Sequence, residues 1–225
     1  MRGQGDDIAG LVRDSRERLN SAAISDSLDS LGYHNQALRP GIHAVDPSLV
    51  LCGLARVGLY MPIYHDDENT NVYEHEIALV DSLKTDEVAV VVCHGMTRIS
   101  PWGELLSTRA AYLGAAGVLT DGSVRDTRLI REMKFPVYCA ATNPMDTKYR
   151  GKLMLYDVPG EIAGARVESG DLVFGDVDGI VIVPRAILHD VLDKALAKVS
   201  AENVVRDEIR AGGSLVDIFA RHGIL

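Results

Sequence analysis

The residues with the clearest capacity for chemistry lie in residues 102–128, WGELLSTRAAYLGAAGVLTDGSVRDTR. Glu104 opens a helical pattern there, and Arg125 and Asp126 follow a short apolar segment, 118–120, that is typical of a buried strand. In α/β proteins, ligands collect in the crevice beyond the carboxyl ends of the strands. We therefore expect Glu104, Arg125 and Asp126 to meet around one anionic ligand and one metal ion.

Periodicity and glycines predict the elements that position these residues. Apolar residues fall on one face of a helix that begins after Gly103 and is interrupted at Gly114. The first free N–H groups of this helix belong to Leu105 and Leu106, and such groups bind anions. Asp121-Gly122-Ser123 predicts a turn after the strand, and its glycine makes a sharp turn toward the site inexpensive.

A second interpretation of the same residues requires no ligand. Asp126 is placed to cap a short helix over residues 127–133 while it pairs with Arg125. Glu104, in the first turn of its own helix, complements the helix dipole. For each residue taken singly both interpretations stay open, but an acidic residue followed after twenty residues by an Arg-Asp pair favours the site.

Length and composition limit the classes of function. The 225 residues suffice for one large or two small domains with a sizeable core. The net charge of −9 argues against a nucleic-acid partner, because phosphate binding requires a basic surface. No apolar run approaches the ~20 residues that span a bilayer, and the first ten residues lack a signal-peptide core. Cys52, Cys93 and Cys139 are far apart, which fits reduced thiols in a cytoplasmic protein.

Strands and helices intermingle along the chain, which predicts an α/β fold. Helical patterns cover residues 7–18, 21–31, 72–83, 104–113, 127–133, 186–211 and 215–219. Strand patterns cover residues 50–61, 87–93, 118–120, 136–141 and 152–158, with two or three short strands in 166–184. We expect one α/β domain, residues 1–185, followed by a C-terminal helical arm, residues 186–225.

Several other motifs favour ordinary structural roles. The acidic run His65-Asp66-Asp67-Glu68 lies in a polar loop, and His75 is expected on a helix surface. His94-Gly95-Met96-Thr97 is not followed by the histidine that a phosphohistidine domain requires. The glycines of 114–117 precede the strand, which argues against a dinucleotide fold. Ser123 lacks the Gly-x-Ser-x-Gly elbow of a serine hydrolase.

The spacing from Glu104 to Arg125-Asp126 resembles the motif of the class II pyruvate aldolases, which act on 4-hydroxy-4-methyl-2-oxoglutarate and 4-carboxy-4-hydroxy-2-oxoadipate. These aldolases share a fold with the RraA regulators of ribonuclease E. Three segments carry the resemblance in order: SAAISDSLDSLG, GELL…GVLTDGSVRD and GDLVFGDVDGIVIVPR. The resemblance covers most of the chain and implies an RraA-like fold of the swivelling β/β/α type with a C-terminal helical arm.

The same resemblance implies a divalent metal, Mg²⁺, Mn²⁺ or another divalent ion, held mainly by Asp126. Glu104 would hold a water on that metal, and Arg125 would bind the carboxylate and carbonyl oxygens of a pyruvyl group. The start of the helix would also bind the carboxylate, at Gly103, Leu105 and Leu106. A hard cation chelated by a 2-keto acid stabilises an enolate without a Schiff-base lysine.

An assembly and a substrate class are implied as well. Family members are homotrimers or homohexamers with sites between subunits, so we expect residues 186–225 to pack on a neighbouring subunit. Glu202 would approach the neighbour's site, with Glu208 as the alternative. The expected reaction cleaves a 4-hydroxy-2-keto acid to release pyruvate, and oxaloacetate decarboxylation accompanies it because both pass through the same enolate. Loops such as residues 60–71 would set specificity.

The chain departs from both branches of the family. The aldolases commonly have aspartate at the position of Glu104, whose extra methylene would shift any group that it holds. The regulators typically have glycine there and glutamate three residues after the aspartate, where this chain has Leu129. A non-catalytic regulator that binds a ribonuclease is the alternative to the lyase, and it predicts no magnesium-dependent turnover.

Overall fold

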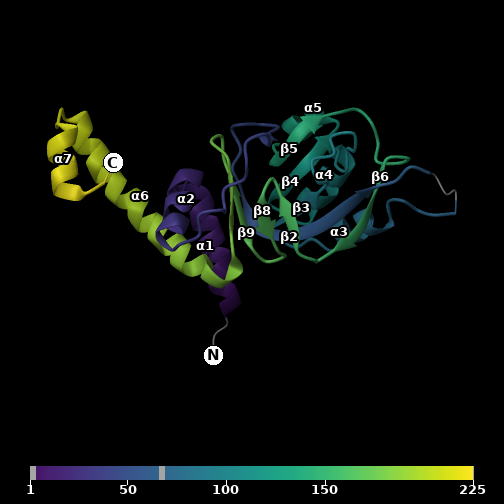
Figure 1. Cartoon of the computed structure of the whole chain (residues 1–225), viewed down its shortest axis with the longest axis horizontal. Coiled ribbons are helices and arrows are strands. Elements are labelled where there is room, and N and C mark those ends of the chain that lie inside the picture. Colours follow the sequence, from purple (N-terminus) through teal and green to yellow (C-terminus); the bar gives the residue numbers. More distant parts are fainter. Residues whose placement is uncertain (1–3, 66–68, 225) are drawn as a thin grey trace.

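The computed structural model describes residues 4–65 and 69–224, which form a curled sheet covered by other elements and a helical arm at one end (Figure 1). The strand order is β1-β5-β4-β3-β2-β9-β10, and β6 also pairs with β2. Strands β2, β3, β4 and β5 are parallel neighbours. The strands of the sheet are β1 (His43–Ala44), β2 (Leu51–Pro62), β3 (Glu87–Val92), β4 (Gly117–Val124), β5 (Val137–Thr142), β6 (Gly151–Tyr156), β9 (Leu172–Gly175) and β10 (Ile180–Val183).

Three helices join the parallel strands and cover one face of the sheet. They are α3 (Glu74–Asp81), α4 (Glu104–Tyr112) and α5 (Thr127–Glu132). One buried cluster holds apolar residues of all three helices together with residues of β3, β4 and β5. Right-handed β-α-β connections place successive helices on the same face. The carboxyl ends of β3 and β4 and the starts of α4 and α5 therefore lie at one edge of the sheet.

The opposite face of the parallel strands is covered by a hairpin of β7 (Gly160–Ile162) and β8 (Ala165–Val167). A second buried cluster joins this hairpin to alternate residues of β2, β3 and β4. Because β3 is covered on both faces, its sequence EVAVVV is apolar almost throughout rather than alternating.

The arm consists of α6 (Leu188–Arg210), preceded by the 3₁₀ turn Arg185–Ile187, and α7 (Leu215–His222). The first half of α6 packs on α1 (Gln4–Arg18), α2 (Ser21–Ser30) and β10 in a third buried cluster. Beyond that cluster α6 leaves the sheet, and α7 folds against its far end (Figure 1). Asn20 caps α2, because its side-chain oxygen accepts a hydrogen bond from the backbone N–H of Ala23 at 2.8 Å.

The α/β class and most of the predicted elements are confirmed, but one local prediction is wrong. Asp121-Gly122-Ser123 is not a turn; it lies inside β4, where the pairing register with β5 shifts between Thr120 and Ser123. A side chain on Gly122 would place its Cβ 2.8 Å from the Sγ of Cys93, so this glycine permits a close approach of strands. Among the described residues, no helix is long and apolar enough to cross a bilayer.

Candidate functional site

Arg125 and Asp126 leave β4 through a sharp change of backbone direction at Asp126. Asp126 has a φ of 58°, in the left-handed region that aspartate tolerates better than most residues. The turn that the sequence requires for an adjacent Arg-Asp pair is thus made by the aspartate itself and not by Gly122. Its effect is that both side chains line one cavity.

The start of α4 is fastened against this turn. Trp102 is buried and forms an isolated parallel bridge with Val124. The backbone N–H of Arg125 donates a hydrogen bond to the carbonyl oxygen of Trp102 at 3.1 Å. Next along the chain, Gly103 lies so close that a Cβ there would be 2.8 Å from Oδ2 of Asp126 and 3.1 Å from Cγ of Arg125. Glycine at 103 therefore allows the arginine and the aspartate to contact the start of the helix.

Asp126 does not cap the helix that follows it. It occupies the N-cap position of α5, but its side chain makes no capping hydrogen bond there. Its Oδ2 instead accepts a hydrogen bond from the backbone N–H of Glu104, at 3.3 Å, at the start of α4. The capping interpretation of Asp126 is therefore wrong for α5, and the carboxylate faces the anion-binding end of α4, where Leu105 and Leu106 supply the next N–H groups.

The cavity at this point, which we name the Arg125 pocket, has a volume of about 210 Å³. Five of its lining residues are those that the sequence predicts: Arg125, Asp126, Gly103, Leu105 and Leu106. Tyr73 and Glu76 of the α3 segment, with Asp146 from the loop after β5, line it as well. The volume suits a small ligand, since sites for drug-sized molecules run from about 300 to 1,000 Å³.

The carboxylate of Glu104 has another partner in this structure. Its Oε1 accepts a hydrogen bond from Oγ1 of Thr108, at 2.7 Å, one turn further along α4. The backbone of Glu104 contacts Asp126, but its side chain is not among the groups that line the Arg125 pocket. Sharing of a water between Glu104 and Asp126 stays a prediction.

The two C-terminal glutamates lie on α6, in the arm. Glu202 pairs with Lys198 at 3.6 Å, and that lysine also bonds Asp26 of α2 at 2.8 Å. Glu208 accepts hydrogen bonds from Arg221 and from His222 at 2.9 Å, which fastens α7 to α6. Helix α6 points away from the side of the sheet that carries α4 (Figure 1). The role of Glu202 at a neighbour's site therefore stays a prediction, and Glu208 has a structural role within its own arm.

Arg125 is held by two carboxylates. Its Nη1 lies 3.4 Å from Oδ1 of Asp146, and its Nε lies 3.8 Å from Oδ2 of Asp126. Asp146 is held in turn by the hydroxyl of Tyr73, which donates to its Oδ2. Burial and this bond to Asp146 raise the pKa of Tyr73 to about 12. The guanidinium is thus oriented from both sides, while its side chain remains 37% exposed and accessible to a ligand.

Glu76 is the most buried carboxyl group of the pocket. It is 8% exposed and accepts a hydrogen bond from the hydroxyl of Tyr60, which is fully buried. Burial, helped by the charge of Asp146, raises the pKa of Glu76 to about 7, against the lowering effects of the Tyr60 hydrogen bond and the charge of Arg125. At neutral pH this carboxyl is therefore present in both protonation states, unlike an ordinary surface glutamate.

The sequence carries a signal for Glu76, although the spacing of Glu104, Arg125 and Asp126 does not include it. Glu76 precedes Leu79, Val80 and Leu83 at the spacing of one helix face, and all of these residues are buried. An acidic residue on the apolar face of a helix is unusual enough to single out. Asp146 had no comparable signal, because it lies in an irregular loop after Pro144.

The Arg125 pocket fits a hydrated hard cation rather than a closed protein cage. Asp126 presents a carboxylate whose side chain is 44% exposed, and carboxylate oxygen is a ligand that Mg²⁺ prefers. Within residues 4–65 and 69–224, no three His, Cys, Asp or Glu side chains are grouped as metal ligands. Mg²⁺ keeps several waters and needs only one or two protein carboxylates, so Asp126 is the residue that would hold it.

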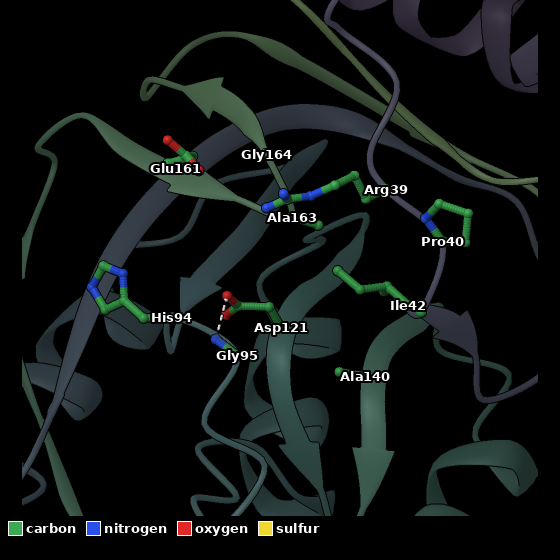
Figure 2. Close-up of a pocket in the computed structure, with 11 residues that line it drawn as sticks. Arg39, Pro40, Ile42, His94, Gly95, Asp121, Ala140, Glu161, Ala163 and Gly164 are labelled. Carbon is green, nitrogen blue, oxygen red and sulfur yellow. Dashed lines mark hydrogen bonds between the residues drawn. The ribbon is translucent and has the colours of Figure 1, made fainter.

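A larger pocket, which we name the Asp121 pocket, lies on the other face of the sheet and has a volume of about 640 Å³. Figure 2 shows Arg39, His94 and Glu161 spread around its mouth, with Asp121 between them. Asp121 is 6% exposed and accepts hydrogen bonds from the backbone N–H groups of Cys93 and Gly95, the latter at 2.8 Å. Arg39, His94 and Glu161 are exposed, and none of them is ion-paired with a described residue.

The remaining candidates from the sequence have structural environments. Ser123 is buried and donates to the carbonyl oxygen of Thr97 at 2.6 Å, and His75 bonds the carbonyl oxygen of Met154. His94 is followed by a loop rather than by a helix, which starts only at Glu104. The three cysteines are buried and free, and burial raises their pKa values. Residues 66–68 of the acidic run lie outside the described residues.

Comparisons with known proteins agree on a family. A family model described as RraA-like, Aldolase/RraA, matches residues 21–182. The chain is 30% identical over 129 residues to a protein of Halalkalibacterium halodurans named "Putative 4-hydroxy-4-methyl-2-oxoglutarate aldolase", covering 56% of this chain and 61% of that protein. It is 27% identical over 196 residues to the protein DlpA of Legionella pneumophila, covering 87% of this chain and 31% of DlpA. The chain thus spans less than two thirds of the length of either relative.

Among solved structures, Streptomyces coelicolor RraAS2 superposes with a TM-score of 0.79 and 29% identity. The superposition covers 88% of this chain and 98% of that chain. RraAS2 is described as an unusual member of the RNase ES inhibitor RraA protein family. The likeness confirms the predicted RraA-like α/β fold with a long C-terminal helix.

Proposed function

Because the chain belongs to the RraA-like aldolase family, we propose that it is a divalent-metal-dependent lyase that cleaves a carbon–carbon bond of a small 2-keto acid. The substrate class is a 4-hydroxy-2-keto acid with a second carboxylate, cleaved to release pyruvate. Oxaloacetate decarboxylation is a side activity of the same site. The observation that carries the proposal is the meeting of Arg125, Asp126 and the start of α4 in one cavity.

Each of these groups matches one part of the substrate. The planar donor fork of Arg125, oriented by Asp146, suits the carboxylate and carbonyl oxygens of a 2-keto acid. The free N–H groups of Leu105 and Leu106 take the same carboxylate at the positive end of the α4 dipole. The small cavity limits the pyruvyl half to a compact group, and the buried Trp102 forms part of its wall.

Asp126 is the proposed ligand of the cation. When bound, the cation supplies positive charge to the oxygen on which negative charge develops as the carbon–carbon bond breaks. Glu104 is proposed to orient water beside Asp126, which requires its carboxylate to leave Thr108. That hydrogen bond joins two exposed side chains, so exchanging it for one to water costs little.

The proposal extends to an assembly in which the arm completes a neighbour's site. The outer part of α6 and α7 expose the apolar side chains Val204, Ile209, Leu215, Val216 and Phe219. Exposed apolar residues gathered on one projecting segment are typical of an interaction surface. A homotrimer or homohexamer would cover them and would bring Glu202 of one subunit toward the site of another.

The second candidate is a non-catalytic regulator that binds a ribonuclease, and the likeness to RraAS2 favours it. Its distinguishing expectation is inhibition of a ribonuclease without any turnover of 2-keto acids. The lyase is preferred because Glu104 and Leu129 differ from the residues that the regulators typically carry.

The test is oxaloacetate decarboxylation by the full chain, measured with Mg²⁺ and again with EDTA, beside the variant Asp126→Ala. We expect activity that requires Mg²⁺ and is lost in the variant. Activity indifferent to both EDTA and the substitution would contradict the lyase. A panel of 4-hydroxy-2-keto acids then identifies the substrate by its kcat/KM.

A further inference from the structure

Glu76 differs from the other carboxylates of the Arg125 pocket because no described cation lies within ion-pair distance of it, whereas Arg125 pairs with both Asp126 and Asp146. Asp146 is paired with Arg125 and bonded by Tyr73, and Asp126 lies against the start of α4. Within the described residues, Glu76 forms no ion pair, and the partner of its Oε2 is the hydroxyl of Tyr60. A buried carboxyl bonded to a neutral hydroxyl can hold a proton at neutral pH.

Glu76 also has the position that a reacting group needs. It projects from α3 into the cavity that Arg125, Asp126, Leu105 and Leu106 line from the other elements. Because the cavity measures only about 210 Å³, a ligand whose carboxylate is bound by Arg125 and α4 shares this small space with Glu76. The titratable groups around Glu76 are Tyr60 of β2, Tyr73 before α3, Asp146 of the loop after β5, Arg125 after β4 and the Cys93 thiol after β3.

The proposed reaction leaves one step without an assigned residue. Aldol cleavage and decarboxylation both leave an electron pair on C3 of the pyruvyl fragment as an enolate, and a proton must be added there to form the methyl group of pyruvate. Arg125 does not donate this proton, because a guanidinium stays a permanent cation in proteins. In this structure the Glu104 carboxylate is bonded to Thr108 and does not line the cavity.

We propose that Glu76, positioned by Tyr60, is the catalytic acid that protonates C3 of the enolate, an inference that rests on the proposed lyase function. For oxaloacetate, the C3–C4 bond breaks, CO₂ leaves, and its electron pair remains as the enolate. The O–H bond of Glu76 then breaks, a C3–H bond forms, and the resulting carboxylate is reprotonated from solvent. In reverse, the Glu76 carboxylate removes a proton from the methyl group of bound pyruvate.

The reverse step gives the test: exchange of the pyruvate methyl protons in D₂O with Mg²⁺, followed by ¹H NMR. We expect the wild-type protein to catalyse exchange and Glu76→Gln to slow it by about 10²-fold or more, in the range for a lost general acid–base. Oxaloacetate consumption should fall less, because bond cleavage precedes protonation and water can supply the proton slowly. Glu74→Gln, on the exposed side of the same helix, is the matched control and should exchange at the wild-type rate.

The outcomes separate the two proposals. Exchange by Glu76→Gln at the wild-type rate would overturn the role of Glu76 and leave the lyase intact. Wild-type protein that decarboxylates oxaloacetate but does not exchange pyruvate protons would do the same. Wild-type protein that does neither would overturn the lyase, and the role of Glu76 with it.

A readout on the metal-free protein tests the protonation state independently. With ¹³C-labelled glutamate carboxyls, we expect one resonance that titrates near neutral pH and is absent from Glu76→Gln. Tyr60→Phe should move its midpoint upward, because the hydroxyl bond stabilises the charged form. If all glutamates titrate below about pH 5.5, Glu76 is ionised at neutral pH and is not the acid. Unchanged circular dichroism shows that the variants fold.

Discussion

The Arg125 pocket and the Asp121 pocket lie at the same edge of the parallel strands, on opposite faces, and hold their charges differently. The Asp121 pocket is three times larger, about 640 Å³ against about 210 Å³. Three of its four ionisable side chains, however, are exposed and have no ion-pair partner within the described part of the chain. Its buried carboxylate, Asp121, accepts hydrogen bonds from two backbone N–H groups, and these bonds fix the loop after β3. That is the arrangement of a structural aspartate.

In the Arg125 pocket the charged groups orient one another. Arg125 is flanked by Asp126 and Asp146, and Asp146 is held by Tyr73. Glu76 is buried on Tyr60, with a pKa raised to about 7. Catalytic groups must be held in place before the substrate arrives, because reorienting them during the reaction costs free energy. The comparison indicates that mutual support between charged groups identifies the site better than volume does.

The largest expected difference between the pockets is in turnover. Asp126→Ala should reduce Mg²⁺-dependent oxaloacetate decarboxylation by on the order of 10³-fold. The substitution removes the proposed protein ligand of the cation whose charge would stabilise the enolate. Glu161→Ala, in the Asp121 pocket, should leave kcat/KM within about twofold. Equal losses in the two variants would show that the comparison assigns the wrong pocket.

The next effect concerns stability. Since burial raises the pKa of Glu76 from 4.5 to about 7, the folded state retains a proton that the unfolded state releases. The resulting stabilisation is complete below about pH 4.5 and is lost as pH rises to about 7, by on the order of 3 kcal/mol. Urea unfolding of Glu76→Gln should lack this part of the pH dependence, and Glu74→Gln should retain it. Parallel curves for wild type and Glu76→Gln would contradict the buried acid.

Replacement of the donor fork should have an intermediate effect. Arg125→Lys keeps the charge but loses bidentate binding, so kcat/KM for oxaloacetate should fall by about 10²-fold. Arg39→Lys is the matched change in the Asp121 pocket and should have no measurable effect. If Arg125→Lys retains full activity, a point charge is sufficient and the geometry around Asp146 is not required.

The smallest of these changes tests how closely the site is packed. Gly103→Ala places a Cβ 2.8 Å from Oδ2 of Asp126, which displaces flexible side chains rather than backbone. We expect a fall in kcat of about tenfold, with little change in melting temperature. Gly10→Ala, in α1 with open space around it, is the control and should be neutral or slightly stabilising. Unchanged kcat in Gly103→Ala would show that the contact with Asp126 is not needed.

Sequence patterns predicted the elements well where burial was uniform. The strand β3 and the helix α2 follow from the pattern of apolar residues, and the spacing of Glu104, Arg125 and Asp126 indicates the edge of the sheet. The error at residues 121–123 arose because Asp-Gly-Ser is typical of turns. There the strand continues because the Asp121 carboxylate accepts hydrogen bonds from backbone N–H groups after β3, and because Gly122 packs on Cys93.

Other parts of the site depend on tertiary contacts that no local pattern encodes. The pairing of Asp146 with Arg125 joins an irregular loop to the end of β4. The Glu104 carboxylate accepts a hydrogen bond from Thr108 rather than turning toward Asp126, and the sequence alone does not determine which of these directions it takes. Glu76 is the intermediate case, since its place on the apolar face of α3 is visible in the sequence but its partner, Tyr60, is not.

The central claim is that one cation and one 2-keto acid bind together at Arg125 and Asp126. Its most direct test is the binding of Mn²⁺, followed by electron paramagnetic resonance, with and without oxalate as a mimic of the pyruvate enolate. We predict that oxalate tightens Mn²⁺ binding at least about tenfold in the wild-type protein, and that Asp126→Ala abolishes this coupling. Mn²⁺ binding that is unaffected by oxalate, or equal in Asp126→Ala, would contradict the account.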